Sequence, residues 1–412
     1  MAMAGQQQDV QLKLPVRRLR GHTDSVLCCA SRPDSPHVVA SSSEDGSVCI
    51  FDIRTAMCCH RLQCFGGQAV VSVLPAPGSE HVLYAAAGST VYCLDVRQGP
   101  TGSPLQTYSF NVEEINQVAL NFKGTYLAAA DDSGAVKVID TRTHKLFKTL
   151  QGAHSNICSS VQFHSRRPWE GKRDYVLPCK NFFEMVLTVV TGGLDSKLVK
   201  WDFNRGRPLQ VVDLAAAAVT SSEGVGGFCN PPFVHALASI EGDVPGEAGK
   251  LLAVARGDGA IDVFDSGLES GSPKQSSQPA VSKRRASTSK DVKRLDDKKS
   301  PSQMDVLVPG RKRHLHLGIG GHASIVNHVT FARFGQRGQF LVSGGNDTFI
   351  KVWDWALEDN PSSDVAATSS QGPLVMNLKH KRKVNWLSTT SSEVENLVVA
   401  DTSKVLSVYS VL

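Results

Sequence analysis

The stretch from Phe340 to Asp354, FLVSGGNDTFIKVWD, constrains the fold more than any other part of the sequence. Two short apolar runs, at 340–342 and 349–353, flank the GGND sequence of residues 344–347. These residue types are typical of a tight turn between two antiparallel strands. Two strands alone bury too little apolar surface to be stable in water. We therefore expect the unit to recur, with its copies packed against one another.

Six further segments repeat this pattern of small residues, a polar turn, and an apolar strand that ends in a large residue followed by Asp or a substitute. They are 40–52, 85–95, 128–140, 191–202, 254–265 and 399–410, which with 340–354 makes seven. The terminal Asp residues of the first three units are Asp52, Asp95 and Asp140, so the first intervals are 43 and 45 residues. This period is typical of the four-stranded blades of a β-propeller.

Three dipeptides, Gly321-His322, Trp201-Asp202 and Trp353-Asp354, resemble the GH and WD dipeptides of WD-repeat proteins. The resemblance implies an all-β fold, a seven-bladed WD-repeat β-propeller. In this family the first strand usually completes the last blade, which closes the ring and removes free sheet edges. Val10 to Leu19 alternates as a strand does, so we expect it to close the ring. Residues 1–9 are predicted to be disordered, and residues 10–412 to form a single propeller.

Histidines recur at one position of the repeat. Each stands four residues before the first residue of an apolar strand; they are His22, His154, His322 and His380. Because this spacing repeats with the blade, a structural role is favoured over a catalytic or metal-binding one. The resemblance implies two hydrogen-bonded relays, each of which ties a turn to a strand within one blade. These consist of His154, Asp195 and Trp201, and of His322, Asp347 and Trp353.

The other blades depart from this pattern. Blade one has His22 and Asp45 but carries Phe51 where the indole donor would stand, so its relay is expected to be incomplete. Blades two, three and five depart further. We therefore expect sequence scoring to find fewer than seven repeats.

No group of residues in the sequence resembles an assembled active site. Cys58-Cys59-His60 with Cys64 nearby lacks the second ligand pair of a zinc site, so no metal site is predicted. The GIGGHA sequence at 318–323 matches a nucleotide-binding motif by count but lacks the strand and helix that the motif requires. We expect no enzyme activity, no cofactor and no small-molecule substrate. No stretch approaches the roughly 20 apolar residues of a membrane span, so no membrane association is expected.

Two segments interrupt the repeat. The interval from Asp140 to Asp202 is 62 residues, and removal of 171–189 restores an interval of 43. Residues 171–189 are therefore predicted to be an insertion, of the kind that a splice variant or a gene-model error supplies. Residues 267–309 are rich in Ser, Lys, Pro, Gln and Asp and are predicted to be a disordered basic linker.

The basic charge of the chain is concentrated around this linker. Residues 283–313 contain eleven Lys or Arg and four Asp, a net charge of +7, whereas the whole chain carries +5. The remainder therefore sums to −2, and nucleic-acid binding is expected only weakly, through the linker. Two basic triplets are candidates for a nuclear localisation signal, with a solvated loop as the alternative. They are Lys283, Arg284 and Arg285, and Arg311, Lys312 and Arg313. We expect the protein in both nucleus and cytoplasm.

Within the WD-repeat family, the sequences EEINQVALN (113–121), HSNICSSVQF (154–163) and KVNWL (383–387) resemble one particular group. That resemblance implies a non-enzymatic protein-binding platform and a role as substrate receptor of a cullin-4 RING ubiquitin ligase. The alternative is a nuclear scaffold that assembles a chromatin or ribosome-assembly complex without a ubiquitin role. The substrate itself is not specified by any motif.

Three consecutive repeats end in Asp-x-Arg. The residues are Asp52 and Arg54, Asp95 and Arg97, and Asp140 and Arg142. The pattern resembles the box through which WD-repeat receptors dock onto the ligase's propeller-containing adaptor, the large damage-specific DNA-binding subunit. None of the three has Trp before Asp, which departs from that box. The alternative interpretation is a turn-stabilising ion pair with an Asp of the same or the adjacent blade. A fork-shaped guanidinium suits carboxylate or carbonyl acceptors on a partner.

Overall fold

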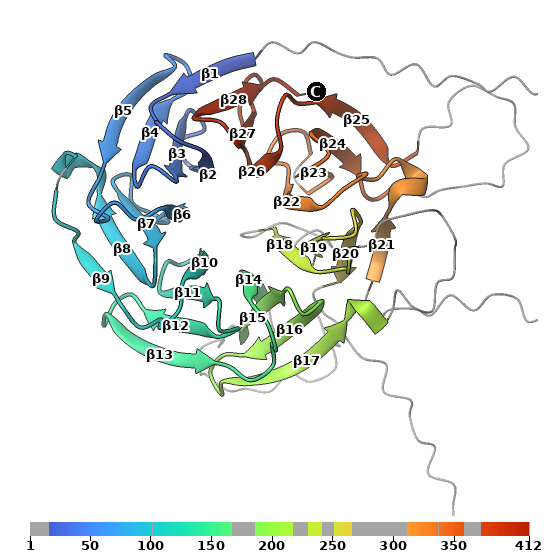
Figure 1. Ribbon diagram of the computed structural model, residues 1–412, viewed down its shortest axis with the longest axis horizontal. Helices are drawn as coiled ribbons and strands as arrows, with labels where there is room; N and C mark the ends of the chain where they lie inside the picture. The colour runs from blue at the N-terminus through green and yellow to red at the C-terminus, as the bar shows by residue number, and fades with distance from the viewer. Residues whose placement is uncertain are drawn as a thin grey trace, which may run out of the picture.

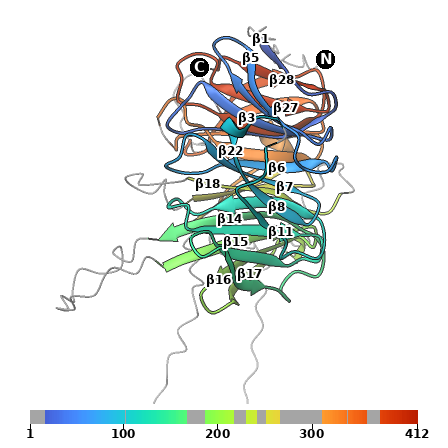
Figure 2. The same ribbon diagram turned by 90° about the vertical axis from the view of Figure 1, so that its left-hand side faces the viewer.

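The computed structural model describes residues 16–100, 102–166, 186–216, 230–240, 251–265, 311–336, 338–357 and 372–411. These residues form seven four-stranded antiparallel sheets arranged as blades around a ring (Figure 1). The side view in Figure 2 places β1, β5 and β28 at one end of the ring and β16 and β17 at the other. The prediction of a seven-bladed, all-β propeller is confirmed.

The strands of each blade follow one another in the chain, from the innermost to the outermost. Blades one to three are β2 (Val26–Ser31), β3 (Val38–Ser43), β4 (Val48–Asp52) and β5 (Met57–Leu62); β6 (Val70–Pro75), β7 (Val82–Ala87), β8 (Thr90–Asp95) and β9 (Gln106–Tyr108); and β10 (Ile115–Leu120), β11 (Tyr126–Asp131), β12 (Val136–Asp140) and β13 (Lys145–Leu150). Blades four and five are β14 (Cys158–Arg166), β15 (Val186–Gly193), β16 (Lys197–Asp202) and β17 (Arg207–Asp213); and β18 (Val234–Ser239), β19 (Leu251–Arg256), β20 (Ile261–Asp265) and β21 (Arg311–Leu315).

The last two blades complete the ring. They are β22 (Val326–Phe331), β23 (Phe340–Gly345), β24 (Phe349–Asp354) and β25 (Leu374–Lys379); and β26 (Val384–Thr389), β27 (Leu397–Asp401), β28 (Val405–Tyr409) and β1 (Val16–Arg20). Two short 3-10 helices, η1 (Val96–Gln98) and η4 (Leu317–Ile319), lie between strands.

The ring is closed by β1, the first strand of the described chain. It pairs antiparallel with β28, from Val16 opposite Tyr409 to Arg20 opposite Val405. Blade seven is therefore built from the two ends of the chain, as the sequence predicted. This pairing covers the edge of β28. An unpaired strand edge there would invite association with another chain.

Neighbouring blades pack face to face through apolar clusters. One such cluster joins Val136 of blade three to Val161 and Trp201 of blade four. Small residues in the second strands allow the blades to approach closely. A Cβ atom at Gly344 would lie 2.7 Å from Val384 Cγ1 of the next blade, and a Cβ at Gly192 would overlap Val234 in the same way. The small residues of the repeat are thus packing positions as well as turn positions.

Antiparallel order divides the loops between two faces of the ring. The loop that enters each first strand and the turn between second and third strands lie at one end, which we call the top face. The turn between third and fourth strands lies at the other end, which we call the bottom face. The histidines of the repeat therefore belong to the top face, and the Asp-x-Arg turns to the bottom face.

The structure corrects one boundary of the predicted insertion. Strand β15 begins at Val186, which pairs with Arg166, and Val189 pairs with both Phe163 and Trp201. Residues 186–189 are therefore part of blade four, although the sequence assigned them to the insertion. The interval between Asp residues fixes only the length of an insertion, because shifting its position leaves the interval unchanged. Residues 171–185, like the predicted disordered segments 1–9 and 267–309, lie outside the described residues.

Candidate protein-interaction surfaces

In blade four, a chain of buried hydrogen bonds joins the turn to the third strand. His154 Nδ1 lies 3.0 Å from Asp195 Oδ1, and His154 Nε2 lies 2.7 Å from Thr191 Oγ1. Trp201 Nε1 donates to the same hydroxyl at 2.9 Å. A carboxylate only accepts hydrogen bonds, so the proton resides on Nδ1, and Nε2 accepts from Thr191. The structure thus brings the three predicted relay residues together through a hydroxyl.

Blade six repeats this arrangement. His322 Nδ1 lies 2.9 Å from Asp347 Oδ2, Nε2 lies 2.8 Å from Ser343 Oγ, and Trp353 Nε1 donates to that hydroxyl at 2.9 Å. Burial lowers the pKa of His322, and the Asp347 carboxylate acts against this shift. Sequence reasoning missed Thr191 and Ser343, although each stands four residues before the turn Asp of its blade. That shared offset is the signal that would have identified them.

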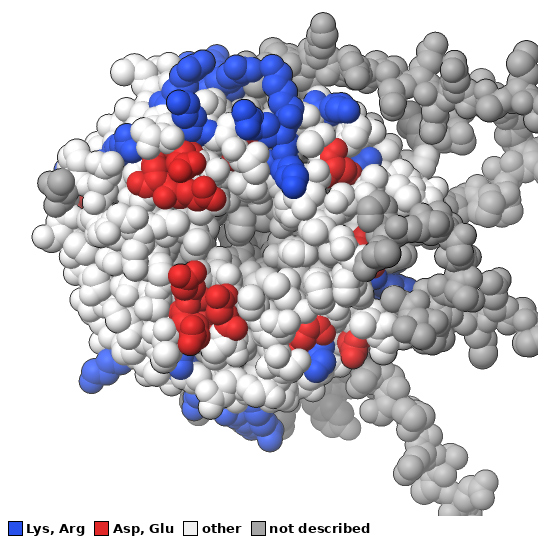
Figure 3. Space-filling view, in the orientation of Figure 1, with Lys and Arg blue, Asp and Glu red and all other residues white. Residues whose placement is uncertain are grey.

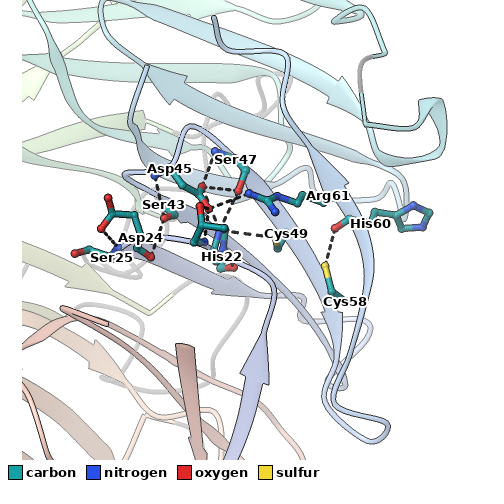
Figure 4. Close-up of polar contacts among 12 residues, drawn as sticks. His22, Asp24, Ser25, Ser43, Asp45, Ser47, Cys49, Cys58, His60 and Arg61 are labelled. Atoms are coloured by element: carbon teal, nitrogen blue, oxygen red, sulfur yellow. Dashed lines mark hydrogen bonds and ion pairs between the residues drawn. The ribbon is translucent and has the colours of Figure 1, made fainter. Parts of the chain in front are cut away.

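Blade one holds an incomplete version of the relay, drawn in Figure 4. His22 Nε2 lies 2.7 Å from Ser41 Oγ, and Nδ1 lies 3.0 Å from Ser47 Oγ. Phe51 is fully buried where the indole stands in blades four and six, so this relay has no such donor. Burial raises the pKa of Asp45, but contacts from Ser47, Thr23, His22 and Arg61 outweigh it and hold the pKa at about 2.

Blade five replaces the relay with an ion pair. The Asp262 side chain is fully buried, and its Oδ2 lies 2.6 Å from Nη1 of Arg256, which is 4% exposed. His314 Nδ1 lies 2.6 Å from Asp262 Oδ1. Burial opposes ionisation of Asp262, but Arg256 and His314 outweigh it and lower its pKa. Arg256 also pairs with Asp258 of the adjoining turn. Blade five thus pairs its buried polar groups through an ion pair, where blades four and six use a hydrogen-bonded histidine relay.

The three Asp-x-Arg turns share one geometry on the bottom face. Each guanidinium pairs with the carboxylate two residues before it, at 2.8 Å for Arg54, 2.6 Å for Arg97 and 3.5 Å for Arg142. The Arg97 side chain, together with its backbone N–H, holds the pKa of Asp95 at about 2. The structure therefore contains the own-blade ion pair that the sequence left as the alternative interpretation. It also leaves the arginine side chains 65%, 63% and 66% exposed, in the same order.

A fourth arginine lies at the corresponding turn of blade four. Arg205 Nη1 lies 3.7 Å from Asp202 Oδ2, and the arginine side chain is 68% exposed. Sequence reasoning missed it because the spacing is three residues rather than two. The bottom face therefore presents exposed guanidinium groups at the end of the third strand in four consecutive blades.

The structure describes one of the two basic triplets that are candidates for a nuclear localisation signal. Arg311, Lys312 and Arg313 begin β21, the outer strand of blade five. Arg311 and Lys312 lie 3.6 Å from Asp262 and Asp265, respectively, and Arg313 donates to the carbonyl of Leu357. Strand pairing places β21 beside β20, so the charges of Arg311 and Lys312 are paired with carboxylates of the same blade. Lys283, Arg284 and Arg285 lie outside the described residues, so their role stays a prediction.

The candidate zinc residues lie on β5 or just beyond it. Cys58 is partly buried and Cys59 is exposed, and the Cys58 thiol contacts the carbonyl of His60 (Figure 4). In the described part of the chain, no group of three or more His, Cys, Asp or Glu residues could hold a metal ion. No helix among the described residues is long and apolar enough to cross a membrane.

Comparison with known proteins gives the same assignment as the blades. A family model described as WD domain, G-beta repeat, matches residues 13–52 and 314–354. The first match spans β1 to β4, so the sequence repeat begins one strand before the blade. The two matches bear out the expectation that sequence scoring would find fewer than seven repeats.

Several curated proteins are similar to this chain. It is 24% identical over 414 residues to WD repeat-containing protein 53 homolog of Dictyostelium discoideum, across 96% of this chain and 94% of that protein. It is 31% identical over 143 residues to THO complex subunit 3 of Arabidopsis thaliana, across 35% of this chain and 43% of that protein. The resemblance predicted from segments such as 154–163 and 383–387 was to WD repeat-containing protein 53, and it is confirmed. The chain contains WD repeats and folds as a seven-bladed β-propeller, a fold that generally serves as a protein-interaction scaffold.

Proposed function

We propose that this propeller is the substrate receptor of a cullin-4 RING ubiquitin ligase and docks the ligase's propeller adaptor through its bottom face. The observation that supports this most directly is the exposure of Arg54, Arg97 and Arg142, whose side chains are about two thirds accessible in three consecutive blades. The partner is a protein. No cofactor, membrane or small-molecule substrate enters the proposal.

The local ion pairs support this role rather than competing with it. Each Asp is much less exposed than its Arg, at 19%, 11% and 14% for Asp52, Asp95 and Asp140. The carboxylate therefore occupies one side of the guanidinium and fixes its orientation, while the other side remains open to solvent. An oriented fork loses less side-chain entropy when it binds an acceptor on a partner.

The alternative is a nuclear scaffold that assembles a chromatin or ribosome-assembly complex without a ubiquitin role. One observation favours it: a relative of part of this chain is named as a subunit of a complex, THO complex subunit 3. Both functions use propeller faces and loops, so the identity of the main partner decides between them. The nuclear and cytoplasmic localisation expected from the basic residues 283–285 is compatible with either function.

The test is affinity capture of the adaptor by the full-length chain. The variant carries Arg54→Ala, Arg97→Ala and Arg142→Ala together, and the matched control carries Lys at the same three positions. Loss of one charge-assisted bond at an interface costs about 1.5–3 kcal/mol. Each such loss is a roughly ten- to hundredfold or greater fall in affinity. We expect the alanine triple variant to lose adaptor capture, with a smaller loss in the lysine variant, which keeps the charge but not the fork.

Melting curves of both variants serve as the folding control, and they should remain close to that of the wild type because the three side chains are exposed. If the alanine variant captures the adaptor at wild-type strength, the docking assignment is wrong and the scaffold function takes its place. If it unfolds, the arginines are structural, and the lysine variant then reports on docking without loss of the fold.

A further inference from the structure

The top face of blade seven carries a cluster of exposed cations from three separate parts of the sequence. Lys381, Arg382 and Lys383 form the loop that enters β26, Lys404 lies in the turn between β27 and β28, and Arg18 and Arg20 lie on β1. Figure 3 shows Lys and Arg side chains gathered over the part of the ring where β1, β26 and β28 lie. We name this set the blade-seven basic cluster.

Hydrogen bonds and strand pairing hold the cluster together. Thr402 N donates to the carbonyl of Lys383 at 3.3 Å, which joins the entering loop to the turn that carries Lys404. Arg20 pairs opposite Val405, the residue after Lys404. Arg18 and Arg20 lie on one side of β1, because the intervening Leu19 is buried on the other. Closure of the ring by β1 therefore assembles the cluster.

These side chains are not engaged in the fold as other cations of the protein are. Arg17, their neighbour on β1, pairs with Glu395, and Arg256 is paired twice inside blade five. By contrast, the side chains of the cluster form no ion pair or hydrogen bond with another described residue. Cations gathered on one surface repel one another, so the free energy of the cluster is expected to fall when it binds an anion.

We propose that the blade-seven basic cluster binds an acidic polypeptide segment of a protein partner. The guanidinium groups offer paired donors that match the geometry of a carboxylate, and the lysines offer mobile single charges. Together they suit a run of Asp and Glu side chains in an extended or loop segment. This proposal rests on the cluster alone and does not depend on adaptor docking, which involves the bottom face.

The charge distribution on the rest of the top face favours a peptide over a nucleic acid or a membrane. Asp24 and Glu44 are exposed on blade one, beside the cluster, and Glu113 and Glu114 are exposed on blade three. Figure 3 shows acidic residues on the same face as the basic ones. A duplex or an anionic bilayer is negative across its whole surface and would be repelled there, over a screening length of about 8 Å at physiological salt. A peptide can confine its carboxylates to blade seven.

The experiment measures binding of a fluorescein-labelled decapeptide of Asp and Glu to the full-length protein by fluorescence anisotropy. The same decapeptide with Asn and Gln is the uncharged comparison. The first variant is Lys381→Ala, Arg382→Ala and Lys383→Ala together, and the second is Arg18→Ala with Arg20→Ala. The matched control, Lys123→Ala, Lys145→Ala and Arg207→Ala, removes three exposed cations from blades three and four. Melting curves are recorded for all variants.

We expect the wild type to bind the acidic decapeptide and not the uncharged one, with affinity that falls as salt is raised. The first variant should lose at least tenfold in affinity, the second several-fold, and the control less than about twofold. Equal losses of affinity in the first variant and the control would show that binding depends only on the net charge of the protein, and would overturn the proposal. Tighter binding of duplex DNA or of phosphatidylserine vesicles, with the same dependence on the cluster, would also overturn it in favour of that polyanion.

Discussion

At the scale of single residues, this fold depends on buried polar groups that are fully paired. The sequence identified His154, Asp195 and Trp201 because they recur with the blade, and the structure places them in one chain of hydrogen bonds. It did not identify Thr191, because a small hydroxyl residue in a strand carries no signal until its partners are known. Its role becomes visible only when two donors or acceptors from distant residues converge on the same oxygen.

The hydroxyl of Thr191 can be tested by its two nearest substitutes. Thr191→Val keeps the shape of the side chain but leaves Trp201 Nε1 and His154 Nε2 buried without a partner. Each unsatisfied buried group costs about 1–3 kcal/mol, so the free energy of unfolding should fall by at least that amount. Thr191→Ser keeps the hydroxyl that Ser343 supplies in blade six and should cost less than about 1.5 kcal/mol. Urea denaturation measures both, and equal losses would contradict the bridging role.

At the scale of an element, each blade satisfies the same packing demand with its own residues. Blade five has no histidine relay and instead buries the pair of Arg256 and Asp262 at the end of β19 and the start of β20. The sequence predicted the existence and order of these strands from their period, since apolar runs and turns recur. The sequence did not predict where β15 begins, because residues 186–189 fit an insertion as well as they fit a strand. The pairing of Val189 with Phe163 and Trp201 shows that these residues belong to the strand. Such pairing joins residues that are distant in the sequence, so a local sequence pattern does not reveal it.

The buried pair of blade five leads to a prediction about stability. Arg256→Met leaves the Asp262 carboxylate buried without its main partner, and breaking a buried pair in this way costs about 3–5 kcal/mol. The double variant Arg256→Met with Asp262→Leu removes both charges, and we expect it to recover most of that loss. Chemical denaturation of the three proteins measures the difference. A double variant as unstable as the single one would show that the ion pair itself is required.

At the scale of the whole molecule, the ring was predictable because seven similar units, the first three of which end at intervals of 43 and 45 residues, leave few other architectures. The surfaces were less predictable. The Asp-x-Arg trio follows from spacing within single blades, whereas the blade-seven basic cluster combines Arg18 and Arg20 with residues more than 360 positions away. Only closure of the ring brings such positions together. The blade-seven basic cluster therefore depends on contacts between segments that lie near opposite ends of the sequence.

Histidines buried in several blades also give the molecule a pH dependence. Burial lowers the pKa of His22, His235 and His322, and lowers that of His328 to about 3. The unfolded chain binds these protons at about pH 6.5, so below that pH it binds more protons than the folded state does. Stability should therefore fall as the pH is lowered from about 6.5 toward 3.

His328→Asn tests this for one residue. Leu387 N donates to His328 Nδ1, and the Asn side-chain oxygen can accept the same bond without titrating. At pH 5 a single histidine with this shift destabilises the folded state by about 2 kcal/mol relative to neutral pH. We expect the difference in unfolding free energy between pH 7.5 and pH 5 to be smaller in the variant by about that amount. An unchanged difference would show that His328 does not contribute.

The pairing of β1 with β28 has a consequence for how the protein is made. Residues 16–20 are synthesised about 390 positions before their partners at 405–409. At about 5–20 residues per second, the strand waits roughly 20–80 s for its partner. During that time blades one to six can form in order, while Leu19 of β1, which is buried in the closed ring, stays uncovered. The growing chain therefore leaves this strand open to chaperones and to aggregation until residues 405–409 have been made.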